Sequence, residues 1–216
     1  MEPVLAQSPE VGLATLVHDL KRHGYAVSDT ALPESIASNL FQAASALDAN
    51  EYSTAGIGRE QDHEVNQFVR GDRIRWVGRH DDRLAAYLEW MERLRLAINR
   101  ELFLGLFEYE CHFARYPVGR FYRTHLDAFR GEANRVLSTV LYLNPQWGPE
   151  DGGELVLYEP DWKTELTRIT PALGRIVVFL SEEFPHEVLP TRRARHSLTG
   201  WFRVNQSSAA KVDPGR

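Results

Sequence analysis

The sequence predicts an α+β fold in which helices support a core of two antiparallel β-sheets, packed as a sandwich or jelly roll. From Leu106 onward, eight short strand-like segments are separated by turn signals, a pattern typical of such cores. The first half instead shows apolar residues at helical spacing. With 216 residues, of which 43% are hydrophobic, the chain is long enough for one large domain to bury a sizeable core.

Three helices are expected in the first half of the chain. The first covers 11–22 and ends at Gly24, before a short extended segment at 25–28. The second covers 33–47. The third covers 81–103, and its outer face is rich in arginine and glutamate. Because each helix has one apolar side, we expect the three to form a layer that supports the sheets.

A polar segment, 53–77, separates the second and third helices; it contains three glycines and ends in the strand-like "IRWV". Long polar segments of this kind are typically flexible or functional loops. We expect a single domain over 1–216, with helical support in 1–105, a jelly-roll core in 106–206 and a tail in 207–216. The expected strands of the core cover 107–116, 119–127, 135–144, 153–159, 167–172, 174–180, 186–190 and 195–205.

The net charge and the cysteine content argue against some classes of protein. The net charge of -5 argues against a general polyanion binder, which needs a basic surface to neutralise phosphates. Cys111 is the only cysteine, so no intramolecular disulfide can form and a reducing compartment is expected. The N-terminus lacks the features of a signal peptide, and the apolar run Ile176–Leu180 is too short to span a membrane. We therefore expect a cytoplasmic protein with no membrane partner.

A candidate metal site begins with His125 and Asp127, which point to the same side if their segment is extended. A lone His-x-Asp pair is more often a surface pair or a hydrogen-bonded turn. His186, which opens a later strand-like segment, is the best third ligand. Two imidazoles and one carboxylate are the donor set of non-haem Fe(II) oxygenases, although zinc hydrolases use the same donors. Cys111 and His112 lie on opposite faces of one expected strand, which argues against a metal site shared between them.

Arg195 strengthens the metal-site interpretation. It follows His186 by nine residues, across the turn-like "PTRRA". A hairpin there would place Arg195 on the strand next to His186, inside the same cavity. A guanidinium in that position can bind a carboxylate through two parallel hydrogen bonds.

With these residues in place, the chain resembles the 2-oxoglutarate- and Fe(II)-dependent oxygenases, in particular the prolyl 4-hydroxylases of the hypoxia-sensing type and their bacterial relatives. The resemblance covers 68–202 and rests on "VRGDRIRWV", "YPVGRFYRTHLD", "VLYLN", "DGGELVLY", "PHEVLP" and "RHSLTGWF", which occur in the family order. The turn before the His-x-Asp pair is slightly shorter than in the family. The resemblance implies a double-stranded β-helix, the cupin-like form of the jelly roll.

The resemblance also implies roles for individual residues. His125, Asp127 and His186 would be the iron ligands. Arg195 would bind the distal carboxylate of 2-oxoglutarate, with the Tyr142 hydroxyl as a second donor; a core tyrosine with a satisfied hydroxyl is the alternative for Tyr142.

Further positions are assigned by the same resemblance to the walls of the cavity. Arg70 and Asp72 would help to fold the segment 53–77 over the site as a lid-like loop; the alternative for this pair is a surface turn of little energetic weight. The wall positions are Tyr116 at the cofactor end, Tyr122 beside the iron, Leu155 and Val188 as apolar wall, Thr199 towards the cosubstrate and Trp201 towards the substrate.

By resemblance, the expected activity is hydroxylation of a prolyl residue in a protein, with Fe(II), 2-oxoglutarate and O2, release of succinate and CO2, and ascorbate as a further candidate cofactor. Elongation factor Tu is the first candidate substrate, because it is a known target of bacterial relatives. Two alternatives stay open. One is an oxygenase that acts on a free amino acid or small metabolite, and the other is a non-catalytic sensor of the metal, oxygen or 2-oxoglutarate.

A nucleic-acid substrate is the remaining alternative within the same superfamily. The branch that demethylates nucleic acids carries a further arginine six residues after its cosubstrate-binding arginine, and here that position is Trp201. This difference and the acidic balance of the chain argue against a nucleic-acid partner. The arginines that raise the question are Arg120, Arg123, Arg192, Arg193 and Arg195.

Overall fold

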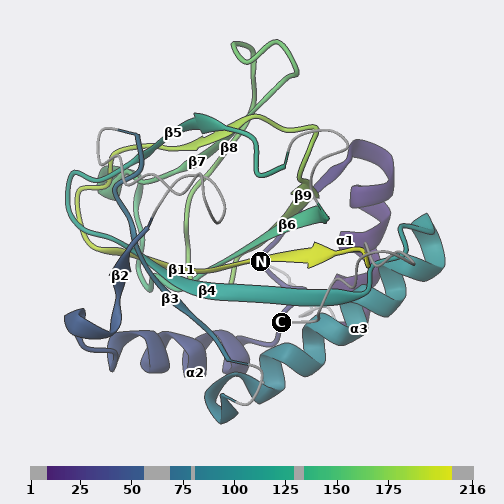
Figure 1. Cartoon of the computed structure of the whole chain (residues 1–216), viewed down its shortest axis with the longest axis horizontal. Helices are drawn as coiled ribbons and strands as arrows, with labels where there is room; N and C mark the ends of the chain where they lie inside the picture. Colours follow the sequence, from purple (N-terminus) through teal and green to yellow (C-terminus); the bar gives the residue numbers. More distant parts are fainter. Residues whose placement is uncertain (1–8, 56–68, 79–80, 129–133, 206–216) are drawn as a thin grey trace, which may run out of the picture.

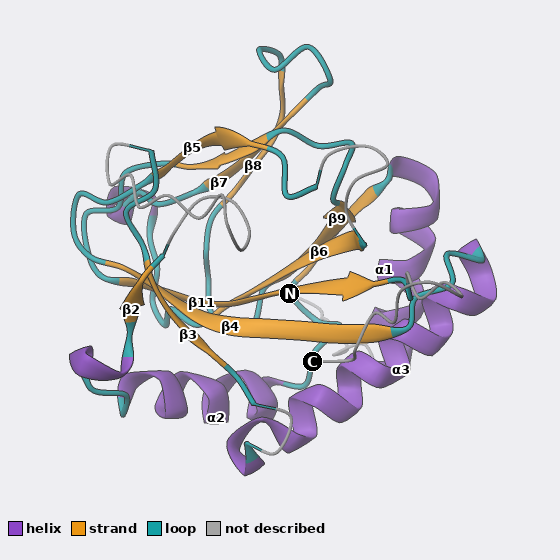
Figure 2. Cartoon of the chain, viewed as in Figure 1, coloured by secondary structure: helices purple, strands orange, loops and turns teal. Residues whose placement is uncertain are grey.

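The computed structural model describes residues 9–55, 69–78, 81–128 and 134–205. Two antiparallel sheets face each other across the centre of the molecule, with the smaller sheet uppermost in Figure 1. The helices lie beneath and beside the larger sheet (Figure 2). The expected arrangement of two packed sheets with supporting helices is therefore confirmed.

The helices follow the expected order, with small shifts at their ends. The third is shorter at its start because the Asp81 side chain accepts a hydrogen bond from the Arg83 backbone N–H, and a 3₁₀ turn precedes the α-helix. Phe103, in the left-handed region with φ 57°, ends it. None of the helices in the described part of the chain is long and apolar enough to cross a membrane. The helices are α1 Pro9–His23, α2 Glu34–Ser45, α3 Ala85–Leu102, and the 3₁₀ helices η1 Ala49–Glu51, η3 Asp82–Leu84 and η4 Pro149–Asp151.

The larger sheet has seven strands and the smaller sheet has four. In sheet order, the larger contains β1 Tyr25–Ser28, β9 Ile176–Leu180, β6 Arg135–Tyr142, β11 Arg195–Arg203, β4 Glu108–Tyr116, β3 Arg73–Trp76 and β2 Ser53–Thr54. The smaller contains β5 Tyr122–His125, β10 His186–Val188, β7 Leu155–Tyr158 and β8 Glu165–Ile169.

Successive side chains of the larger sheet point alternately toward the helices and toward the smaller sheet. On β4, Cys111 and Phe113 point into the apolar core between the larger sheet and the helices. His112 and Ala114, between and after them, face the space between the two sheets instead. Many side chains on the helix-covered face are apolar, whereas the opposite face places polar groups such as His112 between the sheets.

The expected hairpin between His186 and Arg195 is wrong. The strand that carries His186, β10, pairs with β5 and β7 in the smaller sheet. The strand that carries Arg195, β11, pairs with β4 and β6 in the larger sheet. The turn between them crosses from one sheet to the other, so the two residues approach the same space from opposite sides.

Other boundaries also differ from the expectation. The strand expected over 119–127 is shorter, because β5 ends at His125 and Asp127 follows in a bend. Strand β8 begins at Glu165 and ends at Ile169, two residues before Pro171, which has no N–H to donate to a strand partner. The ends of the expected lid-like loop form β2 and β3, which pair with each other. Residues 56–68 of that loop lie outside the described residues.

Candidate active site

A cavity opens between the two sheets, and every site residue expected from the sequence except Tyr142 lines it. Tyr142 lies directly behind the wall, fully buried, with its ring against the Arg195 guanidinium. The residues that line the cavity are Arg70, Asp72, His112, Ala114, Tyr116, Tyr122, His125, Asp127, Val140, Leu155, His186, Val188, Arg195, Ser197, Thr199 and Trp201.

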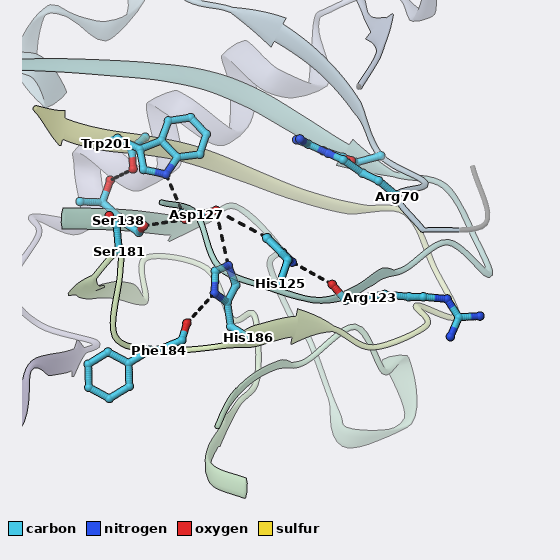
Figure 3. Close-up of polar contacts among 12 residues, drawn as sticks. Arg70, Arg123, His125, Asp127, Ser138, Ser181, Phe184, His186 and Trp201 are labelled. Atoms are coloured by element: carbon cyan, nitrogen blue, oxygen red, sulfur yellow. Dashed lines mark hydrogen bonds and ion pairs between the residues drawn. The ribbon is translucent and has the colours of Figure 1, made fainter. Parts of the chain in front are cut away.

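One end of the cavity holds a cluster of three potential metal ligands. His125 and His186 are partners across β5 and β10, and Asp127 folds back toward them from just beyond β5 (Figure 3). One ligand atom from each lies within 4.8 Å of the others. The Oδ1 atom of Asp127 is 3.5 Å from His125 Nε2 and 3.7 Å from His186 Nε2. Two imidazoles and a carboxylate at this spacing can hold a divalent metal ion.

Both imidazoles are oriented by backbone carbonyls. His125 Nδ1 lies 2.8 Å from the carbonyl oxygen of Arg123, and His186 Nδ1 lies 3.0 Å from that of Phe184. In the tautomer that donates Nδ1–H to these carbonyls, each Nε2 carries its lone pair toward Asp127 Oδ1. This is the tautomer that a metal-binding histidine needs.

The carboxylate is oriented in the same way. Asp127 Oδ2 accepts hydrogen bonds from Ser138 Oγ at 2.6 Å and from Trp201 Nε1 at 3.0 Å. Ser138 Oγ is also 2.9 Å from Ser181 Oγ. Because both donors engage Oδ2, Oδ1 remains directed at the two histidines, as a single-oxygen metal ligand requires (Figure 3).

The protonation states also suit metal binding. Burial raises the pKa of the Asp127 carboxyl, but His186, His125 and the Ser138 hydroxyl outweigh burial and hold that pKa well below its usual range. Burial and the neighbouring His125 lower the pKa of His186 to about 4, against the opposing effect of Asp127. At neutral pH the cluster therefore offers a carboxylate anion and, at His186, an uncharged imidazole.

The other end of the cavity holds a buried guanidinium. Arg195 is 1% exposed, and its Nε donates to the carbonyl oxygen of Gly153 at 2.8 Å. The guanidinium carbon lies 5.0 Å from the ring centres of both Tyr116 and Tyr142. Among the described residues, no carboxylate forms an ion pair with Arg195. Because a buried charge needs a partner, this end of the cavity suits an anionic ligand.

The Tyr142 hydroxyl supports the same interpretation. It is buried and has no hydrogen-bond partner among the described residues, although buried polar groups are normally paired. Burial raises the pKa of Tyr142 to about 12, with Arg195 acting in the opposite direction, so the hydroxyl keeps its proton at neutral pH. A phenol and a guanidinium side by side fit a carboxylate group.

Arg70 and Asp72 form an ion pair in the wall of the cavity, with side chains that are 15% and 1% exposed. Arg70 donates from Nε and Nη2 to the two oxygens of Asp72, at 2.7 and 3.1 Å. Asp72 is 1% exposed, and the Arg70 guanidinium lies 4.8 Å from the ring centre of Tyr122. The alternative of a surface turn is therefore wrong for this pair.

Sequence reasoning missed several residues of the site. His112 lines the cavity, and its ring centre lies 5.5 Å from that of Trp201. The alternation of β4 could have revealed His112, because it places that residue on the same face as Tyr116. No sequence pattern indicated Ser138, because its role is to donate a hydrogen bond to Asp127. The other missed wall residues are Ala114, Val140 and Ser197.

Comparison with known proteins identifies the family. The model of the 2OG-Fe(II) oxygenase superfamily matches residues 111–203. Egl nine homolog 1 of Homo sapiens is 26% identical over 94% of this chain, and the human prolyl hydroxylase EGLN3 is 28% identical over 63% of it. The chain spans about half the length of the curated relatives it matches: 49% of the former and 59% of the latter.

Solved structures agree with the sequence matches. A prolyl-4-hydroxylase of Pseudomonas putida is 45% identical, with a TM-score of 0.80 over 89% of this chain and 98% of that one. A prolyl hydroxylase of Trichoplax adhaerens, in complex with a hypoxia inducible factor peptide fragment, has the same fold, with a TM-score of 0.80, 24% identity and 94% coverage of both chains. The neighbouring folds are double-stranded β-helices. The chain belongs to the 2OG-Fe(II) oxygenase superfamily as a prolyl hydroxylase-type oxygenase, a family that uses Fe(II), 2-oxoglutarate and O2.

Proposed function

We propose that this chain hydroxylates a prolyl residue of a protein, with His125, Asp127 and His186 holding Fe(II), and Arg195 and Tyr142 holding the distal carboxylate of 2-oxoglutarate. One observation carries the proposal: a single cavity has a metal-ligand cluster at one end and a buried guanidinium, without a protein carboxylate among the described residues, at the other. When bound, iron and 2-oxoglutarate supply the oxidising chemistry, with succinate and CO2 as products.

The protein's own contribution is orientation. Three protein ligands leave the remaining metal positions to the cosubstrates. Ser138 and Trp201 fix the carboxylate of Asp127 through Oδ2. Leu155 and Val188, both buried, form apolar wall between the two ends, and such a wall keeps water away from the reacting C–H bond.

The mouth of the cavity favours a macromolecular substrate. Trp76, His112 and Thr199 are successive partners across β3, β4 and β11, so they form a row that leads from the sheet edge into the cavity. Trp76 is 46% exposed, and its ring centre lies 5.0 Å from that of His112. An exposed indole beside a cavity is a typical anchor for a peptide segment.

The identity of the substrate is a narrower proposal. The Trichoplax enzyme was solved with a peptide fragment bound, which supports a peptide-sized substrate here. Elongation factor Tu remains our first candidate, through the resemblance to bacterial relatives. The cytoplasm remains the proposed compartment.

The direct test is turnover. The protein is incubated with Fe(II), 2-oxoglutarate, O2 and proline-containing peptides from loops of elongation factor Tu, and mass spectrometry follows the gain of one oxygen atom on a prolyl residue. His125→Ala is the inactive control. Turnover of a free amino acid or metabolite with no turnover of any prolyl peptide rejects the protein-substrate proposal. If the wild type forms no succinate and behaves like His125→Ala, the proposal that the protein is an enzyme is wrong.

Trp76 separates a peptide substrate from a small one. Trp76→Ala should raise the KM for the peptide about tenfold, since anchor residues of interfaces contribute more than about 1 kcal/mol. Decarboxylation of 2-oxoglutarate without substrate should not change. Trp162→Ala is the matched control, because Trp162 is 45% exposed and does not line the cavity. An unchanged peptide KM in Trp76→Ala contradicts the assignment of the cavity mouth.

A further inference from the structure

A row of basic side chains lies on the outer face of the larger sheet, away from the cavity. Arg73 of β3 and Arg115 of β4 are direct cross-strand partners, and Arg115 is the partner of His196 on β11. The next residue on β4 and on β11 in each case lines the cavity. Because successive side chains of a strand point to opposite faces, the basic row must face outward, toward the helix side.

The two arginines of this row have no counter-ion among the described residues. Glu51 lies 3.4 Å from Arg75, and Asp81 pairs with Arg83 at 2.7 Å and with Arg75 at 3.5 Å. Like charges directly opposite each other on neighbouring strands destabilise a sheet. Two guanidinium groups therefore repel each other at this position without compensation from the described part of the chain.

Three buried polar atoms at the same place have no hydrogen-bond partner among the described residues: Arg115 Nε, His196 Nδ1 and the Tyr52 hydroxyl. Tyr52 is 7% exposed and directly precedes β2, the strand next to β3. Thr54, two residues after Tyr52, is the cross-strand partner of Arg73, and Arg115 opposes the rise that burial causes in the pKa of Tyr52. Unpaired buried donors of this kind are rare in folded proteins.

We propose that Arg73, Arg115, His196 and Tyr52 form a second binding site, which takes a phosphate-class oxyanion. Two guanidinium charges match the charge of about -1.5 to -2 that a phosphate group carries at neutral pH. Guanidinium, imidazole N–H and phenol O–H groups are all donors to oxyanions. Arg73 is exposed and Arg115 is partly exposed, so an anion can reach these two arginine side chains from solvent.

The site is distinct from the cosubstrate end of the cavity. Arg195 and His196 are neighbours on β11, but the first faces the cavity and the second faces outward. Burial, together with Arg115 and Arg195, lowers the pKa of His196 to about 4. At neutral pH its imidazole is therefore uncharged and can donate one N–H, while the arginines supply the positive charge.

The test measures binding of inorganic phosphate to the full chain by calorimetry and by the shift of Tm, with chloride at equal ionic strength as the reference. Wild type should show a saturable increase in Tm. Arg115→Gln and Arg73→Gln should each weaken phosphate binding at least tenfold. Without phosphate, both variants should be at least as stable as wild type, because each removes the repulsion. If an arginine only stabilised the fold, its replacement would instead lower the stability without phosphate. Arg192→Gln, at an exposed turn position, should bind phosphate as wild type does.

Three results would overturn the proposal: no Tm shift with phosphate in wild type, the same shift in Arg115→Gln as in wild type, or a loss of stability in both variants without phosphate. Succinate provides a further arm, since a dicarboxylate carries a similar charge. The contrary result is that succinate raises Tm more than phosphate does and that this increase disappears in Arg115→Gln. That result would assign the row to dicarboxylates and also contradict the proposal. None of these results affects the proposed hydroxylase activity, because no cavity residue is changed.

Discussion

The two ends of the cavity differ in how completely the protein satisfies its own polar groups. At the metal end, His125 and His186 are each held by a backbone carbonyl, and Asp127 by two side-chain donors. At the cosubstrate end, Arg195 makes one hydrogen bond to the protein and the Tyr142 hydroxyl makes none among the described residues. The metal-ligand cluster is therefore preorganised, whereas the end where we propose that 2-oxoglutarate binds has a buried hydroxyl without a partner among the described residues.

This difference suggests a division of roles. A metal ion selects its ligands by geometry, so the protein fixes the direction of each ligand in advance. A flexible dicarboxylate is selected by charge and by directed donors. Changes at the two ends should consequently affect different measured quantities. Three variants test this separation, and a fourth tests the pH dependence of stability.

The largest effect is expected from His186→Ala. Loss of one imidazole leaves two protein ligands, so metal binding and turnover should both fall to background. Titration calorimetry with Mn(II) measures the first, and succinate formation the second. His18→Ala, at an exposed position on α1, is the control and should change neither. Metal affinity that survives in His186→Ala would remove this residue from the ligand cluster.

Arg195→Gln should weaken 2-oxoglutarate binding and leave metal binding unchanged. Truncation of one partner of a buried charge pair costs about 2–5 kcal/mol, so the KM for 2-oxoglutarate should rise by about 30-fold or more. Mn(II) affinity should stay at the wild-type level. Arg168→Gln, which removes an exposed arginine, is the control. Equal losses of metal and 2-oxoglutarate binding would contradict the separation of the two ends.

His112, in the wall of the cavity, should affect the pH dependence of stability. Burial and the nearby Arg70 lower the pKa of His112 from its usual 6.5 to about 4. The folded state thus favours the uncharged imidazole, and its stabilisation is complete above about pH 6.5 and is lost as the pH falls toward 4. The full difference corresponds to roughly 3 kcal/mol.

His112→Gln should therefore flatten the decrease in the free energy of unfolding between pH 6.5 and pH 4.5, as measured by urea denaturation. The exposed His23→Gln should retain the wild-type dependence. If the two variants give the same curve as wild type, His112 does not contribute to the acid sensitivity of the fold.

The smallest effect is expected from Trp201→Phe, which removes the indole N–H donor to Asp127 Oδ2 and keeps an aromatic ring. Loss of a hydrogen bond to a metal ligand typically costs about 10–100-fold in metal affinity. The KM for 2-oxoglutarate at saturating metal should change little. Trp162→Phe serves as the control. Unchanged Mn(II) affinity would show that Ser138 alone is sufficient to orient the carboxylate.

The sequence predicted the parts of the structure that depend on local pattern. The alternation of apolar and polar residues located most strands, and the spacing of His125 and Asp127 placed both near one point even though the strand ends at His125. His186 was found because it opens a short strand next to a buried one. These features follow from residues within a few positions of each other.

The sequence did not predict features that depend on pairing between distant strands. The prediction of a hairpin between His186 and Arg195 was wrong, because the turn after β10 crosses to the other sheet. No local signal in the sequence distinguishes such a crossing from a hairpin. The Trp201 to Asp127 hydrogen bond joins residues 74 positions apart. The basic row formed by Arg73, Arg115 and His196 comes from three strands, and its members have no fixed spacing in the chain.

The "DGG" turn before β7, interpreted from the sequence only as a break between strands, has a consequence for cosubstrate length. Gly153 has a φ of +72°, and a Cβ there would lie 3.0 Å from Cδ of Arg195. The missing side chain lets the arginine lie back against the turn, with Nε on the Gly153 carbonyl. The glycine thus helps to set the position of the guanidinium. In the proposed binding mode, a dicarboxylate must reach both Arg195 and the metal ligands, so this position would limit the length of its carbon chain.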